Sequence, residues 1–447
     1  MLPVRAVHLA AIAACILVRS AAAGPSVTLY THDLGFVRES RELVLRAARD
    51  TVRLEGVAAQ LDFTSVRLAP ASGRVLRLSY RWDTATGEAL LEHAVGERVR
   101  VNSRGDRVDE GVLLAADGGW LVLRGDDGAL TNVARGTLEQ VRLAKPPGTL
   151  SLRPAIEAVI DGARGSIKAE LSYLTGGLSW SAEHTLIRTG ETTAIWSAAV
   201  QMQNTTGRSF EDATVKLIAG DPARTPEGVE PRPVMMMKTA MAEGAAAPGG
   251  MNEQAFADYH LYTLEGPVTL RDRETQSVSM IRPTAITVKP RYTYRAGDAR
   301  GVLSQLEIVN TRKTGPGVPL PGGRVRTFTQ DSAGDLQFIG ESAIAHTPVD
   351  EKCTVDLGYA FDLAATRRNV SEKRVSDRER EYSVEITLRN RKSAPATIVV
   401  EESLGGDSEV VTSSVPALRK DANTVQFVVE LAAGKTATLT YTARQRW

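Results

Sequence analysis

The chain has 447 residues, which is too long for one ordinary hydrophobic core and predicts two to four domains of roughly 100 to 200 residues each. Its content of 43% hydrophobic and 24% charged residues is typical of a soluble globular protein. The formal net charge of +1 excludes a strong overall attraction to nucleic acid or to anionic membranes.

The first 23 residues have the pattern of a secretory signal peptide. A short positive start is followed by the apolar run 6–18 and by the small residues 20–23, which are typical of a cleavage site. Cleavage before Gly24 would remove Arg5 and Arg19 and change the formal charge from +1 to −1. We therefore predict a periplasmic or secreted protein of the cell envelope.

A second interpretation of this segment stays open. Ile12-Ala13-Ala14-Cys15 resembles the lipobox of bacterial lipoproteins, so the chain could instead be anchored by acylation of Cys15. If Cys15 leaves with the signal peptide, Cys353 is the remaining cysteine, no internal disulfide can form, and we expect a buried thiol. No later segment reaches the roughly 20 apolar residues of a membrane-spanning helix, so we expect none in the mature chain.

Alternating apolar and polar residues predict an all-β, multidomain protein built of antiparallel β-sandwich modules. An N-terminal β domain is expected over 24–94, with Asp33-Leu34-Gly35 as a turn between its first two strands. A small SH3-like β-barrel is expected over 95–145, because short apolar runs alternate there with Gly- and Asp-rich hairpin signals.

The central β domain is expected over 150–380. Two alternating runs meet there at Gly176-Gly177, the second ending near Leu186, and short turns between successive runs favour an antiparallel meander through 215–219. A flexible insertion is expected over 222–255, which is rich in proline, alanine and methionine and has no periodicity.

The last module, over 381–447, has the short alternating strands of an immunoglobulin-like β-sandwich. Just before it, residues 367–381 mix basic and acidic side chains without aromatic residues. This mixture predicts a solvated ribbon or strand edge and disfavours a nucleic-acid surface.

Several segments in a fixed order resemble a known family. They are Tyr173 to Trp180, Asn204 to Gly207, Glu211-Asp212-Ala213, Leu217 to Asp221, Pro319 to Gly323, Phe338 to Glu341, His346-Thr347-Pro348 and Gly358 to Asp362. Over about 150–447 the chain is similar to the domain of unknown function that forms the C-terminal half of mucoidy inhibitor A-like proteins, and 27–82 more weakly resembles the N-terminal domain of that family. Longer members carry a coiled coil where this chain has 96–143. The resemblance implies a β-rich envelope protein and brings no catalytic residues.

Ser179, Ser181 and His184 suggest a nucleophile and base, but strand parity puts both serines on the face opposite His184. We therefore expect a half-buried histidine beside Trp180. The Gly176-Gly177 pair lacks the lysine and following helix of a phosphate-binding loop, so we expect a turn or bulge there.

The best candidates for a catalytic or metal-binding cluster are Glu341, His346 and Glu351, because carboxylate and imidazole groups can transfer protons or bind metals. Their spacing matches no metal motif, so we predict no metal site and no cofactor. Asp331 to Asp335 lacks the ligand pattern of a calcium loop and predicts a hairpin tip. The methionines of 235–251 could bind copper or a partner, but a flexible insertion is the simpler interpretation.

These features predict a binding or scaffolding protein of the envelope, with an envelope protein or glycan as partner and no nucleic acid. One alternative is a hydrolase-like enzyme with an interdomain site near Glu341 and His346. Another is an outer-membrane β-barrel ending at Trp447, which the long insertion and segmented modules disfavour.

Overall fold

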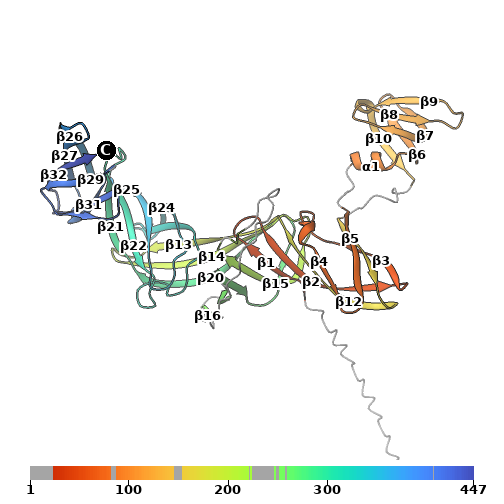
Figure 1. The fold of residues 1–447 in the computed structure, drawn as a ribbon, viewed down its shortest axis with the longest axis horizontal. Helices are drawn as coiled ribbons and strands as arrows, with labels where there is room; N and C mark the ends of the chain where they lie inside the picture. The colour runs from red at the N-terminus through yellow and green to blue at the C-terminus, as the bar shows by residue number, and fades with distance from the viewer. Residues whose placement is uncertain are drawn as a thin grey trace, which may run out of the picture.

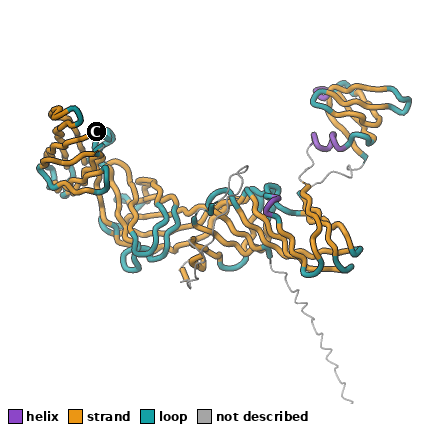
Figure 2. The backbone as a smooth tube through the Cα atoms, in the orientation of Figure 1, coloured by secondary structure: helices purple, strands orange, loops and turns teal. Residues whose placement is uncertain are grey.

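The computed structural model describes residues 24–81, 87–144, 154–220, 222–223, 246–247, 251–256, 259–405 and 407–447. In these ranges the chain is almost entirely β-strand, arranged in six sheets (Figures 1 and 2), which confirms the all-β prediction. Its helical elements are α1 (Gly87–His93) and the 3-10 turns η1 (Phe63–Ser65) and η2 (Arg135–Thr137). None of the helices in these ranges is long and apolar enough to cross a membrane. The predicted signal peptide and most of the predicted insertion lie outside the described residues.

The largest sheet joins the N-terminal strands to strands from the middle of the chain. β1 pairs in parallel with β15, with Val27 opposite Val215, and in antiparallel with β2 across the predicted turn at Asp33. Alternate residues of these strands, such as Val27 and Leu29, are fully buried, as the sequence pattern requires. The sheet order is β16 (Ala246–Ala247), β17 (Met251–Phe256), β18 (Tyr259–Leu264), β15 (Phe210–Ala219), β1 (Ser26–Tyr30), β2 (Gly35–Leu45), β12 (Gly165–Thr175) and β4 (Arg67–Pro70), with β19 (Val268–Leu270) also on β15.

The N-terminal part of the chain also contributes two strands to a three-stranded sheet. Its order is β3 (Arg49–Glu55), β11 (Ala155–Asp161) and β5 (Arg74–Arg81). In the antiparallel pair of β5 and β11, Arg81 lies directly opposite Ala155. Residues 82–154 therefore leave and re-enter the fold at one end of this strand pair.

A five-stranded sheet forms the middle of the body, and its strand pairing shows that the predicted meander is wrong. β13 pairs with β14 as expected, but β12 pairs with β2 and β4, and β15 pairs with β1 and β18. Gly176-Gly177 therefore carries the chain from one sheet to another, and each strand has a neighbour from a distant part of the chain, which is β2 for β12 and β23 for β13. The order is β20 (Glu274–Thr287), β14 (Thr193–Asn204), β13 (Leu178–Arg188), β23 (Gly323–Gln330) and β24 (Leu336–Ile344).

The segment expected to form a small SH3-like barrel forms one five-stranded antiparallel sheet. Its order is β10 (Leu138–Leu143), β6 (Arg98–Ser103), β7 (Arg107–Ala116), β8 (Trp120–Arg124) and β9 (Leu130–Ala134). Its end strands β9 and β10 are not paired with each other in the described residues, so the barrel does not close. This sheet has its own hydrophobic core around Val101, Leu113 and Leu121.

Two sheets at the C-terminal end pack against one core that includes Ile386, Val400 and Phe427, which gives a β-sandwich. One sheet has the order β25 (Lys352–Tyr359), β22 (Leu303–Val309), β21 (Lys289–Arg295), β28 (Ala396–Ser403), β31 (Thr424–Leu431) and β30 (Ala417–Arg419). The other has the order β26 (Leu363–Ser376), β27 (Glu379–Asn390), β32 (Thr436–Arg446) and β29 (Asp407–Ser413).

The charged segment 367–381 and the segment 331–335 form the predicted surface structures. β26 is an edge strand and joins β27 in an exposed hairpin arm, which confirms a solvated ribbon. Asp331 Oδ1 accepts hydrogen bonds from the backbone N–H of Ala333 (2.9 Å) and Asp335 (3.0 Å), which confirms a hairpin tip between β23 and β24.

Candidate binding site

The site begins at the turn that follows β14. Asn204 is buried, and its side-chain NH2 donates to the carbonyl oxygens of Arg208 (2.8 Å) and Leu270 (3.0 Å). Its side-chain oxygen accepts from the backbone N–H (3.1 Å) and the hydroxyl (2.8 Å) of Thr206. This local bonding favours a tight turn, because an asparagine side chain can replace the missing backbone partners.

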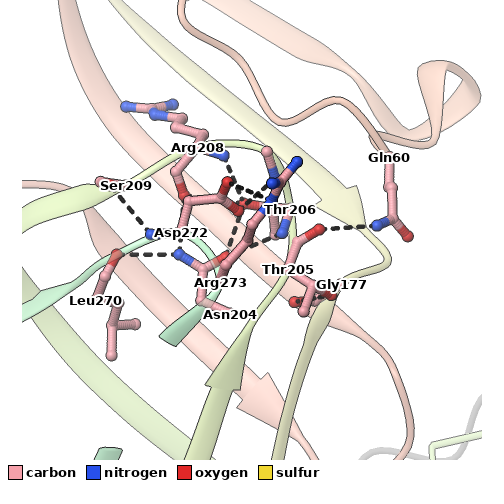
Figure 3. A network of polar contacts seen from close by, with 11 residues as sticks. Gln60, Gly177, Asn204, Thr205, Thr206, Arg208, Ser209, Leu270, Asp272 and Arg273 are labelled. Carbon is pink, nitrogen blue, oxygen red and sulfur yellow. Dashed lines mark hydrogen bonds and ion pairs between the residues drawn. The ribbon is translucent and has the colours of Figure 1, made fainter. Parts of the chain in front are cut away.

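Neighbouring segments hold the turn from several sides (Figure 3). The Thr205 N–H donates to the Gly177 carbonyl (2.7 Å), and the Gln60 amide donates to the Thr205 carbonyl (2.9 Å). The Gly207 N–H donates to Asp272 Oδ1 (2.8 Å), and Asp272 N–H donates to the Ser209 hydroxyl (3.1 Å). These hydrogen bonds hold the backbone of the turn, and they therefore fix the position from which the Arg208 side chain extends.

The Arg208 side chain forms a buried ion pair. Its Nη1 and Nη2 donate to Glu39 Oε1 (2.9 Å) and Oε2 (2.6 Å), and Nη1 also donates to the Tyr173 hydroxyl (3.0 Å). The guanidinium carbon lies 4.9 Å from the centre of the Phe210 ring. The two-pronged contact with Glu39 is both strong and specific in direction.

Glu39 and Arg41 come from β2 and face the same side of the sheet as Tyr173 of β12. Arg41 Nη2 donates to Glu39 Oε1 (2.8 Å) and, at 3.4 Å, to the Gly56 carbonyl. Arg41 Nε is buried and has no hydrogen-bond partner among the described residues. Two guanidinium groups therefore share one buried carboxylate.

The pKa values in this group follow from burial and from the arginines. Burial alone would raise the pKa of Glu39, but the hydrogen bonds and charges of Arg208 and Arg41 hold it below its usual value. Burial would lower the pKa of Arg208, but Glu39 raises it above its usual value. Burial raises the pKa of Tyr173. All three groups keep their ordinary charge at neutral pH.

A cavity of about 510 Å³ opens beside these groups. Its lining includes the side chains of both arginines and of Asp272, together with Gly56, Val57, Pro154, Gly207 and Ser209. The volume lies in the range of pockets that hold small ligands or one residue of a larger ligand. Its unpaired Arg41 Nε is a donor that can bind an acidic or carbonyl oxygen.

The polar residues that the sequence singled out lie elsewhere. Glu341 of β24 is exposed and pairs with Arg326, Nε to Oε2 3.0 Å. The Nδ1 of His346 accepts from the Gly322 N–H (2.9 Å), and the Glu351 carbonyl accepts from the Asn310 N–H (2.8 Å). In the described ranges, no three His, Cys, Asp or Glu side chains form a group that could hold a metal, so Glu341, His346 and Glu351 do not.

The structure separates the serines from the histidine of β13. His184 is buried, its Nε2 is 3.0 Å from the Pro321 carbonyl, and its ring centre is 5.2 Å from that of Trp196. Ser179 is half-buried and Ser181 is exposed, so the parity argument is confirmed. The histidine is more deeply buried than expected and contacts Trp196 of the paired strand β14. The indole Nε1–H of Trp180 donates to the Ile218 carbonyl (3.1 Å).

Two other residue groups have simple outcomes. Cys353 is buried as a free thiol, and burial raises its pKa to about 11, so it is poorly reactive. Met235, Met236, Met237 and Met241 lie outside the described residues, whereas Met251 is buried in β17.

The sequence of β2 carries one signal of this cavity. Val37, Leu43 and Leu45 mark the buried face of β2, and Glu39 and Arg41 occupy the same parity between them. Charged residues at core-facing positions are costly unless they are paired, so they indicate either an internal ion pair or a site. Arg208, which pairs with Glu39, lies 169 residues further along the chain, and no local pattern predicts it.

The fold and this cavity define a multidomain all-β protein whose candidate site is a polar binding pocket at a junction of strands. Residues 169–447 match the family described as "Domain of unknown function (DUF4139)". Since the match covers more than half of the chain, the protein belongs to this family. A search of the curated proteins found no match. Tyr173 and Arg208 lie inside the matched range, whereas Glu39 and Arg41 precede it.

Proposed function

We propose that this chain is a periplasmic or secreted protein that binds or scaffolds an envelope protein or glycan. The signal-like residues 1–23, with either cleavage before Gly24 or acylation of Cys15, support the location. The resemblance to mucoidy inhibitor A-like proteins supports a role in the envelope.

The observation that carries the proposal is the shared carboxylate of Glu39. Arg208 and Arg41 both pair with it, and the cavity beside them is lined by these two arginines and by Asp272. Arg41 Nε is buried without a partner, which costs free energy that a ligand's oxygen would recover. We propose that an acidic or carbonyl-bearing group of the partner enters this cavity.

The ion pair also keeps the site rigid before a partner arrives. Arg208 is held by the bonded turn at Asn204, and Glu39 is held by its strand, so little conformational entropy is lost on binding. A rigid site of this kind suits a binding protein better than an enzyme whose site must close over its substrate.

Of the predicted modules 24–94, 95–145, 150–380 and 381–447, we propose that 95–145 is separable, whereas 24–94 and 150–380 share one hydrophobic core. Support for a separable 95–145 module comes from its core, which shares no residue with the core of the main body. Its insertion between the paired ends of β5 and β11 also supports this proposal.

The proposal is tested by co-purification from the native envelope. The tagged wild-type chain should retain a defined protein or glycan, and Arg41→Gln should lose it while remaining folded by circular dichroism. The matched control is Arg46→Gln, an exposed arginine that follows the same strand and should retain the partner. Equal recovery of the partner by all three chains would remove the cavity from the proposal.

A further inference from the structure

A second cavity lies in the small five-stranded sheet, between α1 and β10. It has a volume of about 440 Å³ and is mainly apolar. Helix α1 contributes Leu90 and Leu91, and β10 contributes Leu138, Val141 and Leu143. The polar side chains that reach it are Glu88 and Arg135. It is separate from the cavity at Arg41 and has different chemistry.

Arg135 lines this groove, and two of its guanidinium nitrogens make no hydrogen bond to the described residues. It begins η2, and its backbone N–H donates to the Gly119 carbonyl (2.9 Å). Its Nη1 donates to Glu88 Oε1 at 2.8 Å. Its Nε and Nη2 are buried and have no hydrogen-bond partner among the described residues. Burial of two unpaired charged donors is costly, so a missing acceptor is the simplest explanation.

The two unused nitrogens form the edge of arginine that binds a carboxylate with two parallel hydrogen bonds. This chain uses the same edge elsewhere. Arg368 Nε and Nη2 donate to the two oxygens of Glu385 at 2.7 and 2.9 Å. Arg300 does the same to Asp298 at 3.0 Å for both bonds. One carboxylate at Arg135 would therefore complete the pattern.

The neighbouring strand can bind a peptide backbone. β10 is the end strand of its sheet, and within the described residues it pairs with β6 alone. Its apolar residues Val141 and Leu143 alternate along the strand toward the groove. Arg135 precedes β10 by three residues, so the carboxylate site lies at the start of that strand.

We infer that this groove binds the free C-terminus of a peptide whose last residues are apolar. The peptide would add to β10 in the antiparallel direction, which places its terminal carboxylate beside Arg135 Nε and Nη2. Its alternate side chains would bury against Leu90, Leu91 and Val141. Backbone pairing favours a peptide over a fatty acid, which has a carboxylate but no amide groups to pair with a strand edge.

The test is binding of a defined peptide to the full chain by fluorescence anisotropy. The probe is a labelled heptapeptide ending in Val-Ala-Leu with a free C-terminus, and its partner probe is the same peptide with a C-terminal amide. The free acid should bind, and the amide should bind about tenfold more weakly or worse, since it loses a charge-assisted pair of hydrogen bonds.

Variants assign the effect to the guanidinium edge. Arg135→Gln should bind both peptides as weakly as the wild-type chain binds the amide, and Arg135→Lys should also be weak because lysine lacks the two-pronged edge. Arg142→Gln is the matched control, because Arg142 is an exposed residue of β10. It should bind like the wild type.

Any of four results would overturn the inference. They are equal binding of acid and amide, equal loss in the Arg142 and Arg135 variants, binding of palmitate without binding of the peptide, and no peptide binding by the wild-type chain. Since the peptide probe does not involve Arg41, failure here leaves the proposed envelope role standing, and failure of the co-purification leaves this inference standing.

Discussion

The residues that matter most for the proposed site are charged groups on a face that otherwise faces the core. Glu39 is 8% exposed, and its carboxylate is stabilised by Arg208 and Arg41. Removing one partner of a buried ion pair leaves an uncompensated charge, which is far more costly than loss of an exposed pair. The same three side chains therefore support both the fold and the cavity.

Arg208→Met should lower the free energy of unfolding by about 3 kcal/mol, because Glu39 then remains buried without its main partner. Chemical denaturation measures the loss. Arg38→Met is the matched control on β2, since Arg38 pairs with Glu170 at the surface. It should lose less than about 1 kcal/mol. Equal losses in the two variants would show that the Arg208–Glu39 ion pair contributes no more to stability than an exposed ion pair.

His184 should make stability depend on pH. Burial lowers its pKa to about 4 from an ordinary value of 6.5, so the fold favours the neutral imidazole. The contribution is fully present above pH 6.5 and falls as the pH decreases toward 4, by about 3 kcal/mol in total.

Denaturation at several pH values tests this dependence. His184→Gln cannot titrate and should flatten the slope of stability between pH 6.5 and 4. A wild-type slope in the His184 variant would assign the dependence to other groups.

At the scale of elements, Gly176-Gly177 connects two sheets and also supports the turn of the site. Gly177 has φ of +80°, and a Cβ there would lie 2.9 Å from the carbonyl carbon of Thr205. The turn that positions Arg208 therefore packs directly against this glycine.

Gly177→Ala should lower the free energy of unfolding by about 1 to 3 kcal/mol, because it adds strain and a steric clash. Urea denaturation measures the change. Gly118→Ala is the control, since a Cβ there would meet no atom within 4 Å. If both variants are equally stable, the close approach of Gly177 to Thr205 is not required.

The sequence predicted most strands well and their pairing less well. Alternation in β2 and β13 is a local property, so it is visible without the fold. The assignment of β12 and β13 to different sheets depends on partners such as Val37 of β2 and Val325 of β23, which lie far away in the chain. Helix α1 was missed, because its seven residues are too short for a clear period.

At the scale of the whole molecule, the N-terminal strands complete the core of the family domain. One core contains Val27 and Leu54 together with Leu217 and Val325. The small five-stranded sheet contributes nothing to this core. The stability of the main body should therefore depend on the strands before residue 82 and should not depend on the small five-stranded sheet.

Replacing residues 82–154 with Asn-Gly should preserve the main unfolding transition, because Arg81 and Ala155 face each other across a strand pair and a two-residue hairpin can join them. Deleting residues 24–30 should prevent folding of the main body, since β15 then loses its partner β1. Calorimetry and limited proteolysis compare the two chains. The opposite order of stability would contradict this division of the core.

The most direct test of the proposed function is photo-crosslinking from the cavity in the native envelope. A photoreactive amino acid at Ser209, which lines the cavity, should capture one defined protein or glycan. Arg41→Gln in the same chain should abolish that product, and a photoreactive residue at the exposed Glu191 should not form it. A product that persists in the Arg41 variant, or an identical product from position 191, would contradict binding at this cavity.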